Sequence, residues 1–236
     1  LSSAIHLAER GYRVVLLEAQ RIGWGASGRS GGQCTLGQRQ PQEELEKRFG
    51  KEEAGTLWDL SVEAVDTVRS LIQRFGIQCD LKRGNLQVAA KQSDANWYRA
   101  HADHMCNAYA LDCRFVEGDE LAHLSGSAAF KGGLVEHASA HLHPLNYALG
   151  LAAAARDLGV ELYENSRVTS YDAASPTCVR TQQGSVSAQF VVLACNGYLG
   201  RLEPRIAGRI MPINNFILAT EPLSAAQQSQ VTGRPN

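Results

Sequence analysis

The feature that most constrains this chain is a buried strand that ends in a carboxylate and leads into a glycine-dense loop. Residues 13–18 read Arg-Val-Val-Leu-Leu-Glu, so that an apolar run stops at Glu18, and residues 23–33 contain five glycines among mostly small and polar residues. A carboxylate in this position accepts hydrogen bonds from ribose hydroxyls in dinucleotide-binding folds. Glycines let a backbone approach a ligand closely. Together they predict an α/β, Rossmann-like nucleotide-binding domain.

The first residues of the chain are predicted to lie within a helix. Leu1, Ala4, Ile5 and Ala8 follow the spacing of one apolar helical face, and Gly11 stands where a C-terminal cap belongs. In a βαβ nucleotide-binding unit, such a helix follows a strand and a G-x-G-x-x-G turn, whose amides receive the pyrophosphate. We therefore expect that strand and turn to precede Leu1, so that the chain is a fragment.

Composition limits the possible partners. The chain has 236 residues, 44% of them hydrophobic, and a net charge of −1. This suits a globular protein with a sizeable core and gives no field that would attract nucleic acid. The apolar runs at 148–155 and 190–195 are shorter than the ~20 residues of a membrane span, so no span is expected. The six cysteines include no C-x-x-C pair, which predicts reduced thiols and a cytoplasmic protein.

Hydrophobic periodicity gives the order of elements. Helices are expected over 43–49 and 52–75, from about 93, over 117–124 and over 145–158. Strands are expected within 79–90, 130–135, 160–164, 167–172, 178–181 and 189–194. The run 189–194 is almost continuously apolar, as in a strand covered on both faces. We therefore assign 1–77 and 142–206 to the nucleotide-binding domain. An inserted mixed α+β substrate domain would include 78–141 and 207–236.

Three histidines have a spacing that metal ligands can adopt. His137, His141 and His143 stand close together, with Glu136 beside the first. The stretch lacks a helical context and leads into a helix that begins with proline, so we predict no metal site. His143, directly before Pro144, is instead a candidate on the substrate side, where the two domains meet.

The sequences of four segments indicate a protein family. Residues 1–9, 23–33, 141–146 and 190–198 resemble the FAD-dependent amine and amino-acid oxidases of the D-amino acid oxidase type, and most closely the gamma-glutamylputrescine oxidases. The resemblance runs through the whole chain. Ser30 stands where this family is expected to have asparagine. Serine keeps a hydrogen-bonding side chain at this position but lacks the reach of the asparagine amide. A C-terminal half with further flavin and substrate contacts is expected beyond Asn236.

The resemblance implies FAD as the cofactor and assigns roles to residues. Glu18 would bind the ribose, while Ser27, Arg29 and Ser30 would donate to the pyrophosphate. Val168 would contact the adenine through its main chain. The predicted cofactor-binding residues are Glu18, Ala26, Ser27, Gly28, Arg29, Ser30, Gly31, Gly32, Gln33, Val168, Ala194 and Gly197. Of these, residues 31–33 would approach the flavin ring, and Ala194 and Gly197 would flank the adenosine diphosphate.

The resemblance also implies a reaction. A primary or secondary amine or an amino acid would be oxidised at its CH–NH group to an imine, with dioxygen reduced to hydrogen peroxide. Water would then hydrolyse the imine to an aldehyde, and the most specific candidate substrate is gamma-glutamylputrescine, in putrescine catabolism. Two alternatives stay open: a flavin-dependent amine dehydrogenase with another electron acceptor, and a flavin-binding subunit without turnover. The partners would be the amine and dioxygen, and the oligomeric state is left open.

Overall fold

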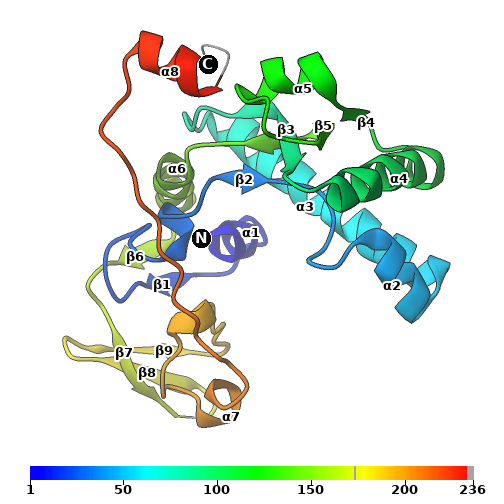
Figure 1. Ribbon diagram of the computed structural model, residues 1–236. Helices are drawn as coiled ribbons and strands as arrows, with labels where there is room; N and C mark the ends of the chain where they lie inside the picture. Colours follow the sequence, from blue (N-terminus) through cyan, green and yellow to red (C-terminus); the bar gives the residue numbers. More distant parts are fainter. Residues whose placement is uncertain (173, 233–236) are drawn as a thin grey trace. The chain divides into compact units, whose positions relative to one another are not determined.

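The computed structural model describes residues 1–172 and 174–232 (Figure 1). By their internal contacts these residues form two compact units. The first unit combines 1–30 with 144–217, and the second combines 31–143 with the described part of 218–236.

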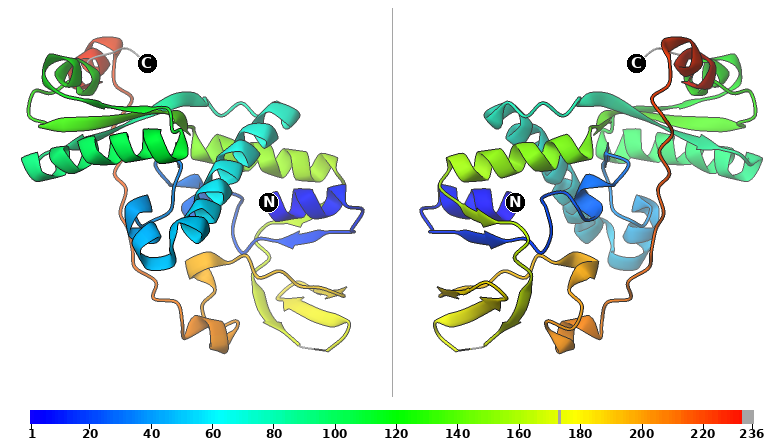
Figure 2. Two further views of the ribbon diagram at one scale, coloured as in Figure 1. Left: turned by 90° about the vertical axis from the view of Figure 1, so that its right-hand side faces the viewer. Right: turned by 90° about the vertical axis from the view of Figure 1, so that its left-hand side faces the viewer.

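The first unit is built on a pair of parallel strands. β1 (Val15–Leu17) pairs with β6 (Glu161–Tyr163), with Leu17 opposite Tyr163. The helices α1 (Ser2–Glu9) and α6 (Pro144–Asp157) lie side by side next to these strands (Figure 2). Gly11, with φ +83°, follows α1 at the predicted cap. The predicted helix, strand, helix and strand are thus confirmed.

An antiparallel sheet follows in the same unit. β7 (Val168–Tyr171), β8 (Thr177–Thr181) and β9 (Ser185–Ala188) pair in sequence order. The short helices η2 (Asn196–Tyr198) and α7 (Pro204–Ala207) come after it. The strands predicted at 167–172 and 178–181 are confirmed, and β9 completes a three-stranded sheet.

The strand predicted at 189–194 is wrong. No strand pairing of the described residues includes this segment, and Phe190 and Val192 are 77% and 63% exposed. An apolar run favours burial, but a strand also needs a neighbouring backbone to pair with its N–H and C=O groups. Within the part of the chain that is described, β1 pairs with β6 alone, so neither strand is paired with this segment.

The second unit has a sheet centred on one long strand. β5 (Gly132–His141) pairs antiparallel with β2 (Gln33–Cys34), β3 (Lys82–Ala89) and β4 (Cys113–Val116). The helices of this unit are α2 (Gln42–Phe49), α3 (Lys51–Phe75), α4 (Gln92–Tyr109), α5 (Gly118–Ser125) and α8 (Ala225–Thr232). The four helices predicted between 43 and 124 are confirmed. In residues 1–172 and 174–232, no helix has the length and apolar character needed to cross a membrane.

The core of the second unit explains why residues 31–77 pack there. Trp58 of α3 lies in one buried cluster with Met105 of α4 and Leu134 of β5. At Gly132, a Cβ would lie only 2.7 Å from the Ala95 Cβ, so glycine lets α4 approach β5. The predicted assignment of 31–77 to the nucleotide-binding domain concerns ligand contacts and stays a prediction. The last four residues of the predicted range 207–236 lie outside the described residues.

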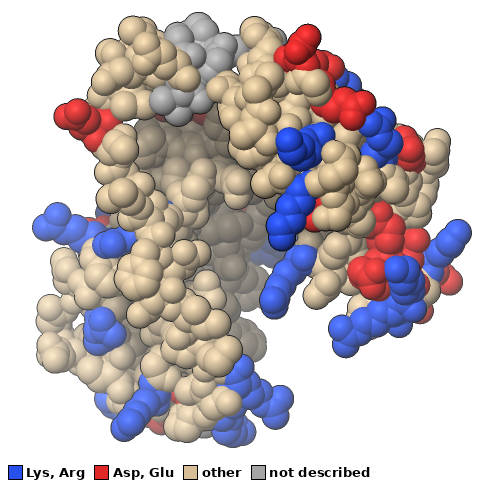
Figure 3. Space-filling view, viewed as in Figure 1, with Lys and Arg blue, Asp and Glu red and all other residues tan. Residues whose placement is uncertain are grey.

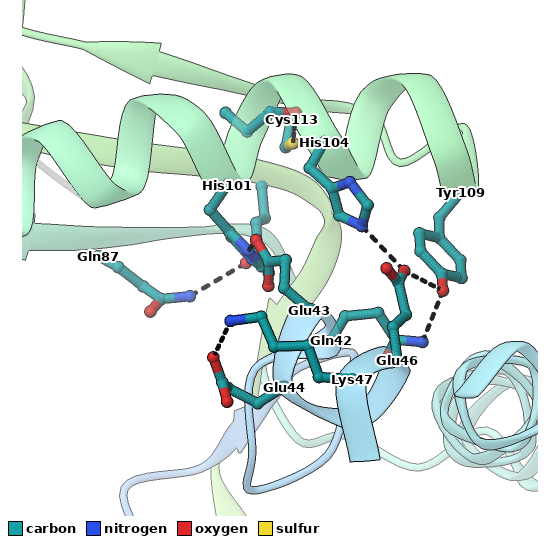
Figure 4. Close-up of polar contacts among 12 residues, drawn as sticks. Gln42, Glu43, Glu44, Glu46, Lys47, Gln87, His101, His104, Tyr109 and Cys113 are labelled. Carbon is teal, nitrogen blue, oxygen red and sulfur yellow. Dashed lines mark hydrogen bonds and ion pairs between the residues drawn. The ribbon is translucent and has the colours of Figure 1, made fainter. Parts of the chain in front are cut away.

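Two histidine–carboxylate pairs join α2 to α4 (Figure 4). His101 Nδ1 lies 2.7 Å from Glu43 Oε1, and His104 Nε2 lies 2.9 Å from Glu46 Oε1. The Tyr109 hydroxyl also donates to Glu46, at 2.6 Å. These contacts fix a short, mostly polar helix that has few apolar residues with which to dock.

We expect Glu46→Gln to destabilise the protein at neutral pH by about 1–2 kcal/mol, because hydrogen bonds to an ionised group are stronger than neutral ones. Burial opposes ionisation of Glu46, but hydrogen bonds from Tyr109 and His104 outweigh it, so its pKa is lowered. A lowered pKa gives stability that is present above the unfolded value, about 4.3, and is lost as the pH falls through the folded value.

Thermal unfolding of the full-length protein at pH 7 and below pH 4 measures this effect. The gap between wild type and Glu46→Gln should narrow in acid. The control is Glu44→Gln on the same helix, where Glu44 forms an exposed pair with Lys47 and should matter little. Equal losses at both pH values would contradict the role given to the Glu46 charge.

Surface charges of both signs lie close together over α4 and α5 in the view of Figure 3. Arg99 pairs with Glu117 at 2.7 Å, and Arg114 pairs with Glu120 at 2.6 Å. All four side chains are about half exposed. Such pairs contribute little stability, and they balance the charge of this surface locally.

Candidate cofactor-binding site

Glu18 lies where the carboxyl ends of two parallel strands meet. Its N–H donates to the Tyr163 carbonyl at 2.9 Å, and its carbonyl accepts from Ser166 N–H at 2.8 Å. The Gln20 N–H donates to Glu18 Oε1 at 2.9 Å. The residue is therefore held on both sides by backbone contacts, and its carboxylate has lone pairs for further hydrogen bonds. Ligands of open α/β sheets bind at this end of the strands.

The glycine-dense loop after Glu18 is anchored and tightly folded. Ile22 N–H donates to Glu164 Oε1 at 2.7 Å, which joins the start of the loop to the end of β6. The loop then forms the short helix η1 (Ala26–Gly28). A Cβ on Gly28 would lie 2.0 Å from the Gly23 carbonyl oxygen. The compact turn thus requires glycine at position 28.

Two aromatic side chains, for which the sequence predicts no role, border this loop. Trp24 and Tyr198 meet edge to face, with ring centroids 6.3 Å apart. Arg29 Nε donates to the Trp24 carbonyl at 2.7 Å, and its guanidinium lies 5.0 Å from the Trp24 ring. A Cβ on Gly25 would be 3.3 Å from the Tyr198 ring. The sequence feature that could have predicted this contact is the position of both aromatic residues inside glycine-containing segments. Packing of a helix face does not account for aromatic residues in such segments.

The segment after residue 193 reaches the neighbourhood of Glu18. Burial and the Glu18 charge raise the pKa of the Cys195 thiol, so this thiol lies within electrostatic range of that carboxylate. At Gly197 a Cβ would meet no atom within 4 Å. Neither packing nor a positive φ requires glycine at this position. Close approach of a ligand to the backbone would require it.

Val168 begins β7 beside the same strand end. It pairs with Thr181 and is half buried. It follows Ser166, which contacts Glu18, by two residues. The predicted residues Glu18, Ala26–Ser30, Val168, Ala194 and Gly197 thus all belong to the first unit, in which Tyr198 contacts Trp24 of the loop. Their roles toward a cofactor stay predictions.

The remaining predicted residues belong to the second unit. Gly32 is buried with φ +73°, and its carbonyl accepts from Leu142 N–H at 2.9 Å. Gln33 is exposed and stands opposite His141. At Gly31 a Cβ would meet nothing within 4 Å. These features fix the backbone of the segment and leave open space on Gly31.

His143 is exposed, and its N–H donates to the Cys79 carbonyl at 2.7 Å. This contact holds its backbone at the end of β5, while its role toward a substrate stays a prediction. Among residues 1–172 and 174–232, no group of three or more His, Cys, Asp or Glu side chains is placed to hold a metal ion.

The side chains of Glu18 and of the loop that follows it suit a dinucleotide. A carboxylate at the strand end suits ribose hydroxyls, and the exposed side chains of Ser27, Arg29 and Ser30 can donate to phosphate oxygens. Arg29 uses Nε internally and has further N–H donors in its planar group. The fold and the site therefore define a dinucleotide-binding α/β protein.

The family follows from the whole sequence. The profile of the family described as DAO, FAD dependent oxidoreductase, matches residues 1–236. The chain belongs to this family, and FAD is the family's cofactor. The predicted fold class, family and cofactor are thereby confirmed.

Named relatives agree with this assignment. The chain is 38% identical to a probable oxidoreductase, OrdL, of Haemophilus influenzae, over 98% of the chain and 55% of that protein. It is 37% identical to the gamma-glutamylputrescine oxidoreductase of Escherichia coli, over 95% of the chain and 53% of that protein. The chain thus spans about half the length of the curated relatives it matches.

Solved structures show the same fold. Glycine oxidase from Geobacillus kaustophilus superposes with a TM-score of 0.69 at 22% identity, covering 87% of this chain and 54% of that one. L-proline dehydrogenase from P. horikoshii gives 0.64 at 20% identity, covering 90% and 54%. At such identities the likeness concerns the fold alone.

Proposed function

We propose that the full-length protein is an FAD-dependent amine oxidase whose substrate is gamma-glutamylputrescine. The observation that carries this proposal is the 37% identity, over 95% of the chain, to a gamma-glutamylputrescine oxidoreductase. The dinucleotide-type site around Glu18 supports the cofactor part independently, because it rests on geometry. Dioxygen as the electron acceptor and a cytoplasmic location belong to the same proposal.

In this proposal the chain holds the adenosine diphosphate part of FAD. The Glu18 carboxylate accepts hydrogen bonds from the ribose, and Ser27, Arg29 and Ser30 donate to the pyrophosphate. Val168 contacts the adenine through its main chain. Ala194 and Gly197 border the diphosphate, where the open space at Gly197 admits close approach.

Residues of the second unit would contact the flavin ring and the substrate. The backbone at Gly31, Gly32 and Gln33 would lie along the flavin ring, and the buried, hydrogen-bonded Gly32 would keep that backbone in place. His143 would help to position the amine. FAD, when bound, supplies the acceptor for the electrons removed from the carbon that bears the nitrogen. The protein must align that C–H bond and bind the amine in its neutral form.

The test is anaerobic absorbance spectroscopy of the full-length protein with gamma-glutamylputrescine, followed by air and a peroxide assay. We expect the amine to bleach the flavin band, and air to restore it with release of hydrogen peroxide. Propylamine, which lacks the glutamyl group, is the control for substrate class and should bleach the band far more slowly.

The other outcomes separate the alternatives. A band that bleaches but recovers only with a quinone would indicate a dehydrogenase. A flavin band that no amine bleaches would indicate a flavin-binding protein without turnover. A protein that binds no FAD would contradict the proposal at its first step.

A further inference from the structure

Two cysteines outside the cofactor site lie in direct contact. Cys106 is on the last turns of α4, and Cys113 begins β4. Their sulfur atoms are 3.5 Å apart. The Cys106 thiol also donates to the Cys113 carbonyl at 3.1 Å, so the Cys106 side chain is held toward its partner. The connection between them is short and turns at Ala110, whose φ is +50°.

The surroundings of the two thiols are unlike each other. Cys106 is exposed, whereas Cys113 is buried in the cluster with Trp58, Met105 and Leu134. Burial, followed by the neighbouring Cys106 thiol, raises the pKa of Cys113 to about 12. An oxidant in solution therefore meets Cys106 first, since access and thiolate character both govern thiol oxidation.

We propose that Cys106 and Cys113 form a redox site that hydrogen peroxide converts to an intramolecular disulfide. The Cys106 thiolate attacks one peroxide oxygen, the O–O bond breaks, and the sulfur becomes a sulfenic acid as hydroxide leaves and takes up a proton to form water. The Cys113 thiol then loses its proton, its sulfur attacks the Cys106 sulfur, and the S–O bond breaks to release a second water. Two thiols are oxidised, and one peroxide is reduced to two waters.

The geometry favours this second step over further oxidation. The sulfurs must close from 3.5 Å to about 2.05 Å, and Cys106 lies close to the end of α4, where a helix can adjust. Burial, the main cause of the raised Cys113 pKa, also shields Cys113 from direct attack by peroxide, so Cys113 stays available to resolve the sulfenic acid.

The site requires only that peroxide reaches Cys106, so it does not depend on the proposed substrate. The test therefore adds hydrogen peroxide directly to reduced full-length protein, in the absence of any amine. After alkylation of the remaining thiols, digestion without reductant is followed by mass spectrometry. Trypsin leaves both cysteines in one peptide, residues 100–114, and cleavage before aspartate separates 103–111 from 112–118.

We expect the tryptic peptide to lose the mass of two hydrogens and to carry no alkyl group. The peptides 103–111 and 112–118 should stay joined until a thiol reductant separates them. In Cys106→Ser the link should be absent. In Cys113→Ala, Cys106 should remain as a sulfenic acid that a 1,3-diketone reagent labels. Cys178→Ser, which changes a half-buried cysteine of the first unit, is the control and should form the link as wild type does.

Two results would overturn the proposal. One is a wild-type protein in which both thiols are still alkylated at peroxide doses that oxidise Cys178. The other is equal labelling of Cys106 by the diketone in wild type and in Cys113→Ala, which would show that Cys113 does not resolve the sulfenic acid.

Discussion

Replacing Glu18 by glutamine is expected to weaken FAD binding to the full-length apoprotein by about 10- to 100-fold, because hydrogen bonds to a charged group contribute about 1.5–3 kcal/mol. Glutamine keeps an oxygen for the Gln20 N–H, which Glu18 Oε1 accepts at 2.9 Å, so the local fold should persist. The change removes the negative charge that favours two donating ribose hydroxyls. Titration of the apoprotein with FAD, followed by flavin fluorescence, measures the loss.

Glu161→Gln is the matched control for this variant. Glu161 lies on the adjacent strand β6 and forms an exposed pair with Arg13. Its replacement removes the same charge from the same sheet without touching the strand end, so FAD affinity should stay within about twofold, in line with the small energy of exposed ion pairs. Equal FAD affinity in wild type and Glu18→Gln would show that Glu18 does not bind the ribose.

The second large effect is expected at Gly28. A Cβ there would lie 2.0 Å from the Gly23 carbonyl oxygen and 2.8 Å from its carbonyl carbon. Because these are backbone atoms, no side chain can rotate away, and the loop must change its path. We expect Gly28→Ala to destabilise the full-length protein by about 3 kcal/mol, to lower its melting temperature by several degrees, and to abolish measurable FAD binding.

Two other glycine variants separate stability from binding. Gly184→Ala changes a turn where a Cβ meets nothing within 4 Å, and it should alter neither quantity. Gly197→Ala also has open space, so it should keep the melting temperature of the apoprotein but weaken FAD binding. Differential scanning calorimetry without FAD and fluorescence titration with FAD provide the two readings. A Gly28→Ala protein with unchanged melting temperature would contradict the predicted clash.

Local sequence determined the elements of the first unit well. Glu18 directly follows β1 because the apolar run stops there, and Gly11 and Gly159 end their helices with φ values of +83° and +84°, which glycine adopts at little cost. These features depend on short-range periodicity and on backbone preferences, both of which are set by residues that are neighbours in the sequence. The predicted family and cofactor rest on the same motifs and are confirmed.

Long-range pairing was decided by the tertiary structure. The apolar run 189–194 has the composition of a buried strand, yet it stays unpaired among the described residues, because a strand needs an edge supplied by another segment. Tertiary packing also decided the contact of Trp24 with Tyr198 and that of Cys106 with Cys113, because the sequence alone does not show which side chains meet.

The sequence by itself therefore determined the α/β class, the strand that ends at Glu18 and the glycine-dense loop, because each depends on residues that are close in the chain. The tertiary structure alone decided that Tyr198 meets Trp24, that Gly28 must pack against Gly23, and that residues 31–77 share a core with β5. Those outcomes depend on burial and backbone pairing between distant segments, and only the folded chain brings these together.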